Sequence, residues 1–382
     1  DRALDREWIE ELRDASGAGA IEVYLKRGRS RRFVRTVGLE QASEATEQGW
    51  AVRASTDRGS FLRCGTGYPE PTIGWPQPDG LPIRLPEPRP VPQWRQPAEV
   101  EAPLSSESEI RSLVVAIEKE LLRDLPAARL DHIVLEDGQS QSWIGNSNGL
   151  LETWRGRAAA LTLEASTSAH RGARVRLEAV RREVRELSPR QLARRLVDLL
   201  SVMTEGRPVV RDRSEVVVAP RVASRLIAGL WPLFDPLRSE PLVEALGKAG
   251  KIGGPALTLI DDGRFPGGVL AAPVDGEGTP TQEVVLIEEG QFLQPLRGWW
   301  EEAAGTRTGG CSRRFSWRDE PRIGPSHFYL KPDPTTRAAK LVSSLARGYY
   351  LLDSAPEASF DFSSDRFSLA AVSYTHLTLP TI

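Results

Sequence analysis

Residues 265–290 read FPGGVLAAPVDGEGTPTQEVVLIEEG, and this stretch constrains the fold more than any other part of the chain. Gly267 and Gly268 lead into a run of small residues, and an acidic turn follows them. The apolar residues at 283–287 predict a strand, and the glycine that ends residues 288–290 indicates a second turn. The acidic turn consists of Asp275, Gly276, Glu277, Gly278, Thr279, Pro280 and Thr281.

The acidic turn has two possible roles. Asp275 and Glu277 lie two residues apart, and as a catalytic acid and base they would need a cleft and separated pKa values. As turn residues they need only Gly276 and Gly278, which we expect to adopt backbone angles that cost a residue with a Cβ about 1 kcal/mol or more each. We therefore interpret the turn as structural, or as a contact with a partner or a peptide, and predict no catalytic residue.

The stretch resembles the signature of the TldD/PmbA family, also called the modulator of DNA gyrase family. That signature has a small residue, Pro, Asp, Asp or Gly, Glu-Gly, a Thr and then LIE-x-G. A second resemblance lies near the N-terminus, where the strand IEVYLKRG at residues 21–28 precedes GWAVRASTDRGSFLRCGTG at residues 49–67. The family has a similar strand followed by a meander, so two separate regions carry the resemblance.

The resemblance implies a particular subunit of that family. Its TldD subunit carries a zinc-binding His-Glu-x-x-x-His helix, whereas its PmbA/TldE subunit lacks one. None of His132, His170, His327 and His376 has a second histidine at that spacing. Residues 220–234, PRVASRLIAGLWPLF, lie where the helix is expected and contain no histidine, acid or cysteine. The sequence is thus similar to the subunit without zinc, and we predict no metal site in this chain.

This similarity implies a function by association. The chain would be the non-catalytic subunit of a heterodimeric zinc metallopeptidase that processes or degrades peptides in the cytosol. Its partners would be a TldD-type catalytic subunit, which would hold the zinc, and a peptide. The alternative is a stand-alone binding or scaffold protein of the same fold. A neighbouring gene with the His-Glu-x-x-x-His helix would favour the first hypothesis, and a genome without one the second.

His327 and Cys311 are two further candidates for a reactive group. His327 stands alone at the start of an expected strand, which favours a structural histidine over a metal ligand. A nucleophilic Cys311 would need a positioned base, and no sequence pattern identifies one.

Composition excludes several classes of protein. With 50 Lys and Arg against 52 Asp and Glu, the net charge of −2 argues against a nucleic-acid binder. Two distant cysteines suit a reducing compartment. No apolar run approaches the roughly 20 residues that span a bilayer. No signal peptide is recognisable, so we expect a cytoplasmic protein without membrane contact.

The expected fold class is α+β with two domains. Residues 1–205 would form a mixed α/β domain, and a proline-rich connection at 68–97, with ten prolines, would lie on its surface. Residues 206–371 would form a β-rich domain with few helices. Residues 372–382, VSYTHLTLPTI, look like the translation of a sequencing adapter. We therefore expect them to pair with no central strand.

Local signals predict several elements. Ser106 and Glu109 form a capping box ahead of a helix. Asp137-Gly138 and Asn148-Gly149 indicate turns. Residues 171–195 hold nine arginines against three glutamates. This block could bind phosphate, but without interleaved aromatic residues a solvated face is the favoured interpretation.

Overall fold

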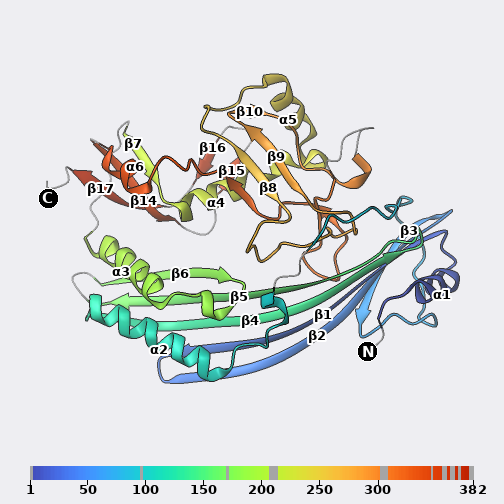
Figure 1. The fold of residues 1–382 in the computed structure, drawn as a ribbon, viewed down its shortest axis with the longest axis horizontal. Coiled ribbons are helices and arrows are strands. Elements are labelled where there is room, and N and C mark those ends of the chain that lie inside the picture. Colours follow the sequence, from blue (N-terminus) through green and yellow to red (C-terminus); the bar gives the residue numbers. More distant parts are fainter. Residues whose placement is uncertain are drawn as a thin grey trace.

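The computed structural model describes residues 3–94, 98–168, 172–205, 214–301, 309–345, 347–354, 359–361, 366–368 and 371–377. Its largest element is a curved antiparallel sheet in the N-terminal half, with the C-terminal half lying against one side (Figure 1). The expected α+β class, with a mixed N-terminal half and a strand-rich C-terminal half, is confirmed.

The long sheet has six strands in the order β3-β2-β1-β4-β5-β6. Its strands are β1 (Ala20–Thr36), β2 (Leu39–Thr56), β3 (Gly59–Thr66), β4 (Ala128–Asn146), β5 (Leu151–Thr167) and β6 (Ala173–Arg181). Strand β1 is one continuous strand of 17 residues. The turn at Asn148-Gly149 joins β4 to β5, and Gly149 has a φ of 90°.

The turn predicted at Asp137-Gly138 is wrong, because both residues lie within β4. The Asp137 side chain is fully buried, and its Oδ2 lies 3.1 Å from Nη2 of Arg157 on β5. The same oxygen accepts the backbone N–H of Ser105 at 2.7 Å. These tertiary partners hold the aspartate in an extended strand against its local preference for turns.

Among the described residues, three α-helices cover the N-terminal half. Helix α1 (Arg6–Ser16) packs Trp8, Ile9 and Leu12 into one core, together with apolar residues of β1 and β2. Helices α2 (Glu107–Asp124) and α3 (Pro189–Glu205) cover the other end of the sheet. The predicted capping box of α2 is present, with the Ser106 and Glu109 side chains each bound to the other residue's backbone N–H.

The proline-rich connection is irregular, as expected. Residues 68–94 contain an isolated bridge between Gly80 and Ser60 and otherwise neither helix nor strand. The segment is also anchored, because Leu85 is buried and the backbone oxygens of Leu85 and Pro86 accept hydrogen bonds from Asn148 and Asn146.

The C-terminal half combines short strands with helices. Strands β8 (Leu259–Asp262), β9 (Glu283–Glu288), β10 (Gln291–Phe292) and β13 (Phe328–Leu330) form one sheet in the order β10-β9-β8-β13. A second sheet contains β7 (Glu215–Val218), β14 (Arg347–Ser354) and β17 (Ala371–Leu377). Two-stranded ladders join β11 (Ser312–Arg313) to β12 (Arg322–Ile323), and β15 (Ser359–Asp361) to β16 (Arg366–Ser368).

Three helices belong to this half: α4 (Pro220–Leu230), α5 (Pro236–Ala249) and α6 (Ala338–Ser343). Helix α5 was not predicted, because Pro236, Pro241 and Gly247 are signals that usually interrupt a helix. Pro236 lies at its start, where the missing N–H costs nothing, and Asp235 caps it by accepting the N–H of Leu237.

The expectation that residues 372–382 pair with no central strand is wrong as far as the chain is described. Strand β17 runs antiparallel to β14, which is the middle strand of its sheet. Residues 378–382 and the proposed boundary at 206 lie outside the described residues. The division into 1–205 and 206–371, and the foreign origin of the tail, remain predictions.

Candidate functional site

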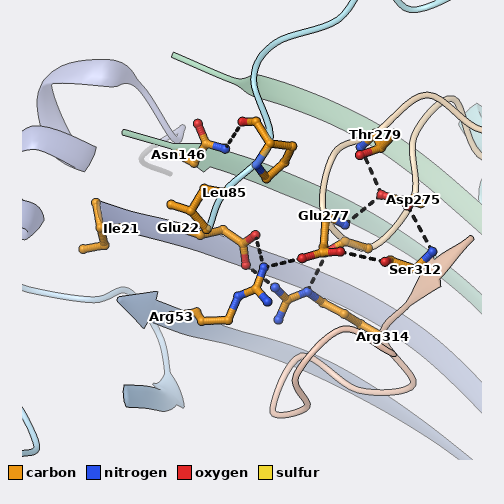
Figure 2. A network of polar contacts seen from close by, with 12 residues as sticks. Ile21, Glu22, Arg53, Leu85, Asn146, Asp275, Glu277, Thr279, Ser312 and Arg314 are labelled. Atoms are coloured by element: carbon orange, nitrogen blue, oxygen red, sulfur yellow. Dashed lines mark hydrogen bonds and ion pairs between the residues drawn. The ribbon is translucent and has the colours of Figure 1, made fainter. Parts of the chain in front are cut away.

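The acidic turn lies between β8 and β9 and is folded around the Asp275 carboxylate. Oδ1 of Asp275 accepts the backbone N–H groups of Glu277 and Thr279 at 2.9 and 3.0 Å, and Oδ2 accepts that of Ser312 at 3.0 Å (Figure 2). Three backbone donors thus converge on one side chain that is only 3% exposed. The aspartate fixes the shape of the turn and attaches it to β11.

Glu277 points in another direction, into the N-terminal sheet. Its Oε1 lies 2.6 Å from Nη2 of Arg53 on β2, and its Oε2 accepts the Ser312 hydroxyl at 2.7 Å. The same Arg53 nitrogen lies 2.9 Å from Oε2 of Glu22 on β1. One buried arginine therefore joins a glutamate of each half of the chain.

Arg314 completes this interaction from the loop after β11. Its Nη2 pairs with Oε1 of Glu22, and its Nε donates to the backbone oxygen of Gly276 at 2.8 Å. Its guanidinium also lies 4.9 Å from the centre of the Tyr24 ring. We call Glu22, Arg53, Glu277 and Arg314 the charge cluster; Figure 2 shows the four side chains pointing toward one another.

Burial and charge act in opposite directions within the charge cluster. Burial alone would raise the pKa of Glu22, but Arg53 and Arg314 hold that pKa below its usual value. Burial would lower the pKa of Arg53, and the carboxylates of Glu22 and Glu277 raise it instead. Glu22 is therefore ionised and Arg53 protonated at neutral pH.

Asp275 has the opposite balance. Burial and the neighbouring Glu277 charge raise its pKa to about 7, although Arg313 and the backbone donors act against them. A cavity of about 220 Å³ lies beside it, lined by both halves of the chain, with Tyr24, Trp154, Asp275, Arg313 and Phe315 among its residues. Because Glu277 does not line this cavity, the two carboxyls do not face a common substrate space. The hydrogen bonds support the structural interpretation; contact with a partner or a peptide remains a prediction.

Of the two glycines of the turn, Gly278 has the expected backbone conformation and Gly276 does not. Gly278 has a φ of 82°, and a Cβ there would lie 2.6 Å from the Leu150 side chain. Gly276 has no such positive φ, so the strain predicted for it is wrong. A Cβ at Gly276 would instead lie 3.2 Å from the backbone of Arg313 and Arg314. Thr279 and Thr281 are buried, and the Thr281 hydroxyl donates to the Ala272 oxygen.

Trp317 strengthens the contact between the halves. It is buried against Tyr24, Ile144 and Leu150, and its Nε1 donates to Glu47 at 2.7 Å. The ring lies so close to Gly49 that a Cβ there would fall 2.2 Å from it.

His327 and Cys311, the candidate reactive residues, have structural surroundings. The backbone N–H of Leu270 donates to Nε2 of His327, which leaves Nδ1 to donate to the Asp262 oxygen at 2.9 Å. Burial lowers the pKa of His327, which keeps the ring neutral. Burial also raises the pKa of Cys311 to about 11, so its thiol stays protonated.

Helix α4 covers the stretch where the resemblance implies the zinc motif of the catalytic subunit, and its polar side chains do not suit a metal. Nε of Arg221 and Nη1 of Arg225 both donate to Oδ1 of Asp353 on β14, at 2.9 and 2.8 Å. Protonated guanidiniums have no lone pair to offer a cation, so these residues do not fit zinc. His132 lies on β4, His376 lies on β17, and His170 falls outside the described residues.

Within the described ranges, no three His, Cys, Asp or Glu side chains gather in a way that could hold a metal ion. In the same ranges, no helix has the length and apolar character needed to cross a membrane.

Sequence reasoning found the acidic turn but missed its partners. Glu22 alternates with the apolar Ile21 and Val23, a pattern typical of a side chain facing solvent, yet it is 1% exposed because the C-terminal half covers that face. Arg53 and Arg314 are separated from the turn in the sequence. The residues around each arginine form no pattern that indicates a contact with the turn.

Replacing Gly278 tests the contact between turn and sheet. We expect Gly278→Val to lower the free energy of unfolding by about 1–3 kcal/mol more than Gly267→Val, because of overlap with Leu150. Gly267 is a matched control, because its φ is 78° and a Cβ there would have no atom within 4 Å. Denaturant unfolding of both variants measures the difference, and equal losses would contradict the proposed packing.

The raised pKa of Asp275 predicts a pH dependence. Between about pH 4 and pH 7 the unfolded chain has lost this proton while the folded chain retains it, so the group lowers stability as pH rises. We expect the wild type to lose about 2 kcal/mol relative to Asp275→Asn between pH 5 and pH 7. Denaturant titrations at both pH values measure this difference, and a difference that does not change with pH would refute the assignment.

Comparison with known proteins finds a family match for the C-terminal part of the chain. Residues 211–377 match the PmbA/TldA metallopeptidase C-terminal domain, a range that includes β17. An uncharacterized protein of Methanocaldococcus jannaschii is 31% identical over 234 residues, which covers 56% of this chain and 53% of that protein. The chain thus spans about half the length of this curated relative.

Solved structures share the fold over nearly the whole chain. TldE from Thermococcus kodakarensis has a TM-score of 0.77 and 21% identity, covering 92% of this chain and 83% of that one. A candidate modulator of a DNA gyrase from Thermotoga maritima has a TM-score of 0.72 and 16% identity, covering 91% and 82%. A similar protein from Bacteroides thetaiotaomicron also has a TM-score of 0.72, with 14% identity over 96% and 85%. The domain match covers the C-terminal part of the chain, and the fold shared with these structures extends over nearly the whole chain, so the chain is similar to TldD/PmbA-type proteins in both respects.

Proposed function

We propose that this chain is a TldE-type, non-catalytic subunit that acts with a TldD-type zinc subunit in peptide processing or degradation. The observation that carries the proposal is the chemistry of α4. Where the family's catalytic subunit has two histidines and a glutamate, α4 presents Arg221 and Arg225, both bound to Asp353. Zinc would belong to the partner, and this chain would bind none.

The rest of the site fits a supporting role. Asp275 and Glu277 are engaged in holding the turn against the long sheet. The chain would contribute a rigid wall to a chamber shared with the partner, and the partner would supply the metal and the base. Such a complex would work on unfolded or modified peptides in the cytoplasm.

Reconstitution tests the proposal. The chain is co-expressed with a TldD-type subunit from the same genome, and zinc and cleavage of an unfolded peptide are measured for each protein alone and for the mixture. We expect co-purification, cleavage by the mixture that a chelator abolishes, and neither stoichiometric zinc nor cleavage with this chain alone. A partner whose motif glutamate is replaced by glutamine is the control, and it should bind this chain without cleaving.

Two results would overturn the proposal. Stoichiometric zinc and chelator-sensitive cleavage by the isolated chain would make it an enzyme in its own right. Failure to associate with the TldD-type subunit, or a genome that lacks one, would leave the alternative of a stand-alone binding or scaffold protein.

A further inference from the structure

A groove lies between the edge of the long sheet and α4, on the side of the molecule away from the charge cluster. Two cavities that share Glu178, Leu199 and Arg221 form it, with volumes of about 210 and 570 Å³. Strand β6 and helix α3 provide one wall, and α4 and β14 provide the other. Figure 1 shows these four elements near one another at the same end of the molecule.

Arginines dominate the smaller cavity. Arg174 and Arg176 come from β6, and Arg221 and Arg225 from α4, whereas the acidic lining residues are Glu178 and Asp353. Four positive charges thus face two negative ones. Arg176 pairs with Glu178 at 2.8 Å, and Arg174 approaches Asp131 outside the cavity only to 3.9 Å. The lining therefore favours an anion.

Each of the two α4 arginines forms hydrogen bonds through some of its guanidinium nitrogens only. Arg221 uses Nε for Asp353 and Nη1 for the Glu178 backbone oxygen, and Arg225 uses Nη1 for Asp353 and Ser354. Within the described residues, no hydrogen bond engages Nη2 of either arginine. Their side chains are 23% and 15% exposed, so Asp353 and the backbone hold them in place while they still reach solvent.

Apolar residues line the groove beside these cations. Val175, Leu199 and Met203 border the smaller cavity. The larger one continues along Leu177, Ala179, Val180, Tyr350 and Leu352. The smaller cavity is below the roughly 300–1,000 Å³ of sites for drug-sized ligands, so it suits one residue at the end of a longer molecule. Strand β6 is also an edge strand, with an outward carbonyl that Arg221 already contacts.

We propose that this groove binds the C-terminal end of a peptide, with the terminal carboxylate against Arg221 and Arg225 and an apolar last side chain beside Leu199 and Met203. The planar guanidinium matches a carboxylate in shape and charge. Apolar side chains then continue along the larger cavity, beside Arg181 and Arg195, so the chain of a peptide would find contacts there that an isolated phosphate would not use. The choice of a peptide rests on the proposed function, whereas the preference for an anion rests on the lining alone.

The test measures binding of a short unstructured peptide that ends in leucine, labelled at its N-terminus, to the isolated full-length chain. The same peptide with a C-terminal amide is the matched ligand. We expect the free acid to bind at least roughly tenfold more tightly, equivalent to about 1.4 kcal/mol. Equal affinity for acid and amide, or no binding by the folded chain, would refute the proposal.

Variants place the binding in the groove. Arg174→Gln with Arg176→Gln removes two exposed charges without touching Asp353, and Arg225→Gln removes a donor nearer the proposed carboxylate. Both should reduce the preference for the acid, with folding checked by circular dichroism. Arg32→Gln is the control, because Arg32 is 54% exposed and pairs with Glu136 on the same sheet, as Arg176 is 56% exposed and pairs with Glu178. An undiminished preference in both groove variants would overturn the assignment.

Competition with inorganic phosphate distinguishes a carboxylate-binding site from a phosphate-binding site. If phosphate displaces the peptide at concentrations at which acetate does not, the groove is a phosphate site and the carboxylate assignment is wrong. Because this test needs no partner subunit, its outcome is independent of reconstitution. If the free acid binds but the reconstituted complex does not cleave, the groove proposal stands and the peptidase role is refuted. If the complex cleaves but the chain shows no preference for the acid, the peptidase role stands and the groove proposal is refuted.

Discussion

The structure depends on a charge cluster buried between its two halves. Arg53 lies between Glu22 and Glu277, which come from strand β1 and from the acidic turn, and Arg314 returns to Glu22 from the far side. A buried ion pair contributes little net stability when complete, because desolvation offsets the attraction. Removing one member leaves a charge without its partner, which costs about 3–5 kcal/mol. The cluster therefore specifies how the halves meet more than it strengthens the fold.

The neighbouring features follow from this contact. Asp275 shapes the turn so that Glu277 reaches Arg53, and Gly278 lets the backbone pass Leu150 without a side chain between them. Trp317 packs against Tyr24, Ile144 and Leu150. At the opposite end, Asp353 plays a comparable part by holding the arginines of α4. The two ends differ in their balance of charge. In the charge cluster the two arginines pair with the two glutamates, whereas the groove between the long sheet and α4 keeps an excess of positive charge.

Sequence alone predicted the elements whose causes are local. The capping box at Ser106, the strand after the acidic turn and the turn at Asn148-Gly149 depend on residues a few positions apart, and each is present. At two positions distant partners decide the structure. Asp137 continues a strand because Arg157 meets it from the next one, and Glu22 is buried because another part of the chain covers it. The resemblance located the acidic turn but not Arg53, since a pairing across more than 200 positions leaves no local pattern.

The charge cluster also has a consequence for evolution. Its four residues come from four separate places in the chain, yet the loss of any single one leaves an unbalanced charge in the interior. We therefore expect substitutions in the charge cluster to occur in oppositely charged pairs, such as the joint replacement of Arg53 and a glutamate by neutral side chains. Among homologues that retain this arrangement of the two halves, Glu22, Arg53, Glu277 and Arg314 should covary as a group, even where the surrounding strands have diverged.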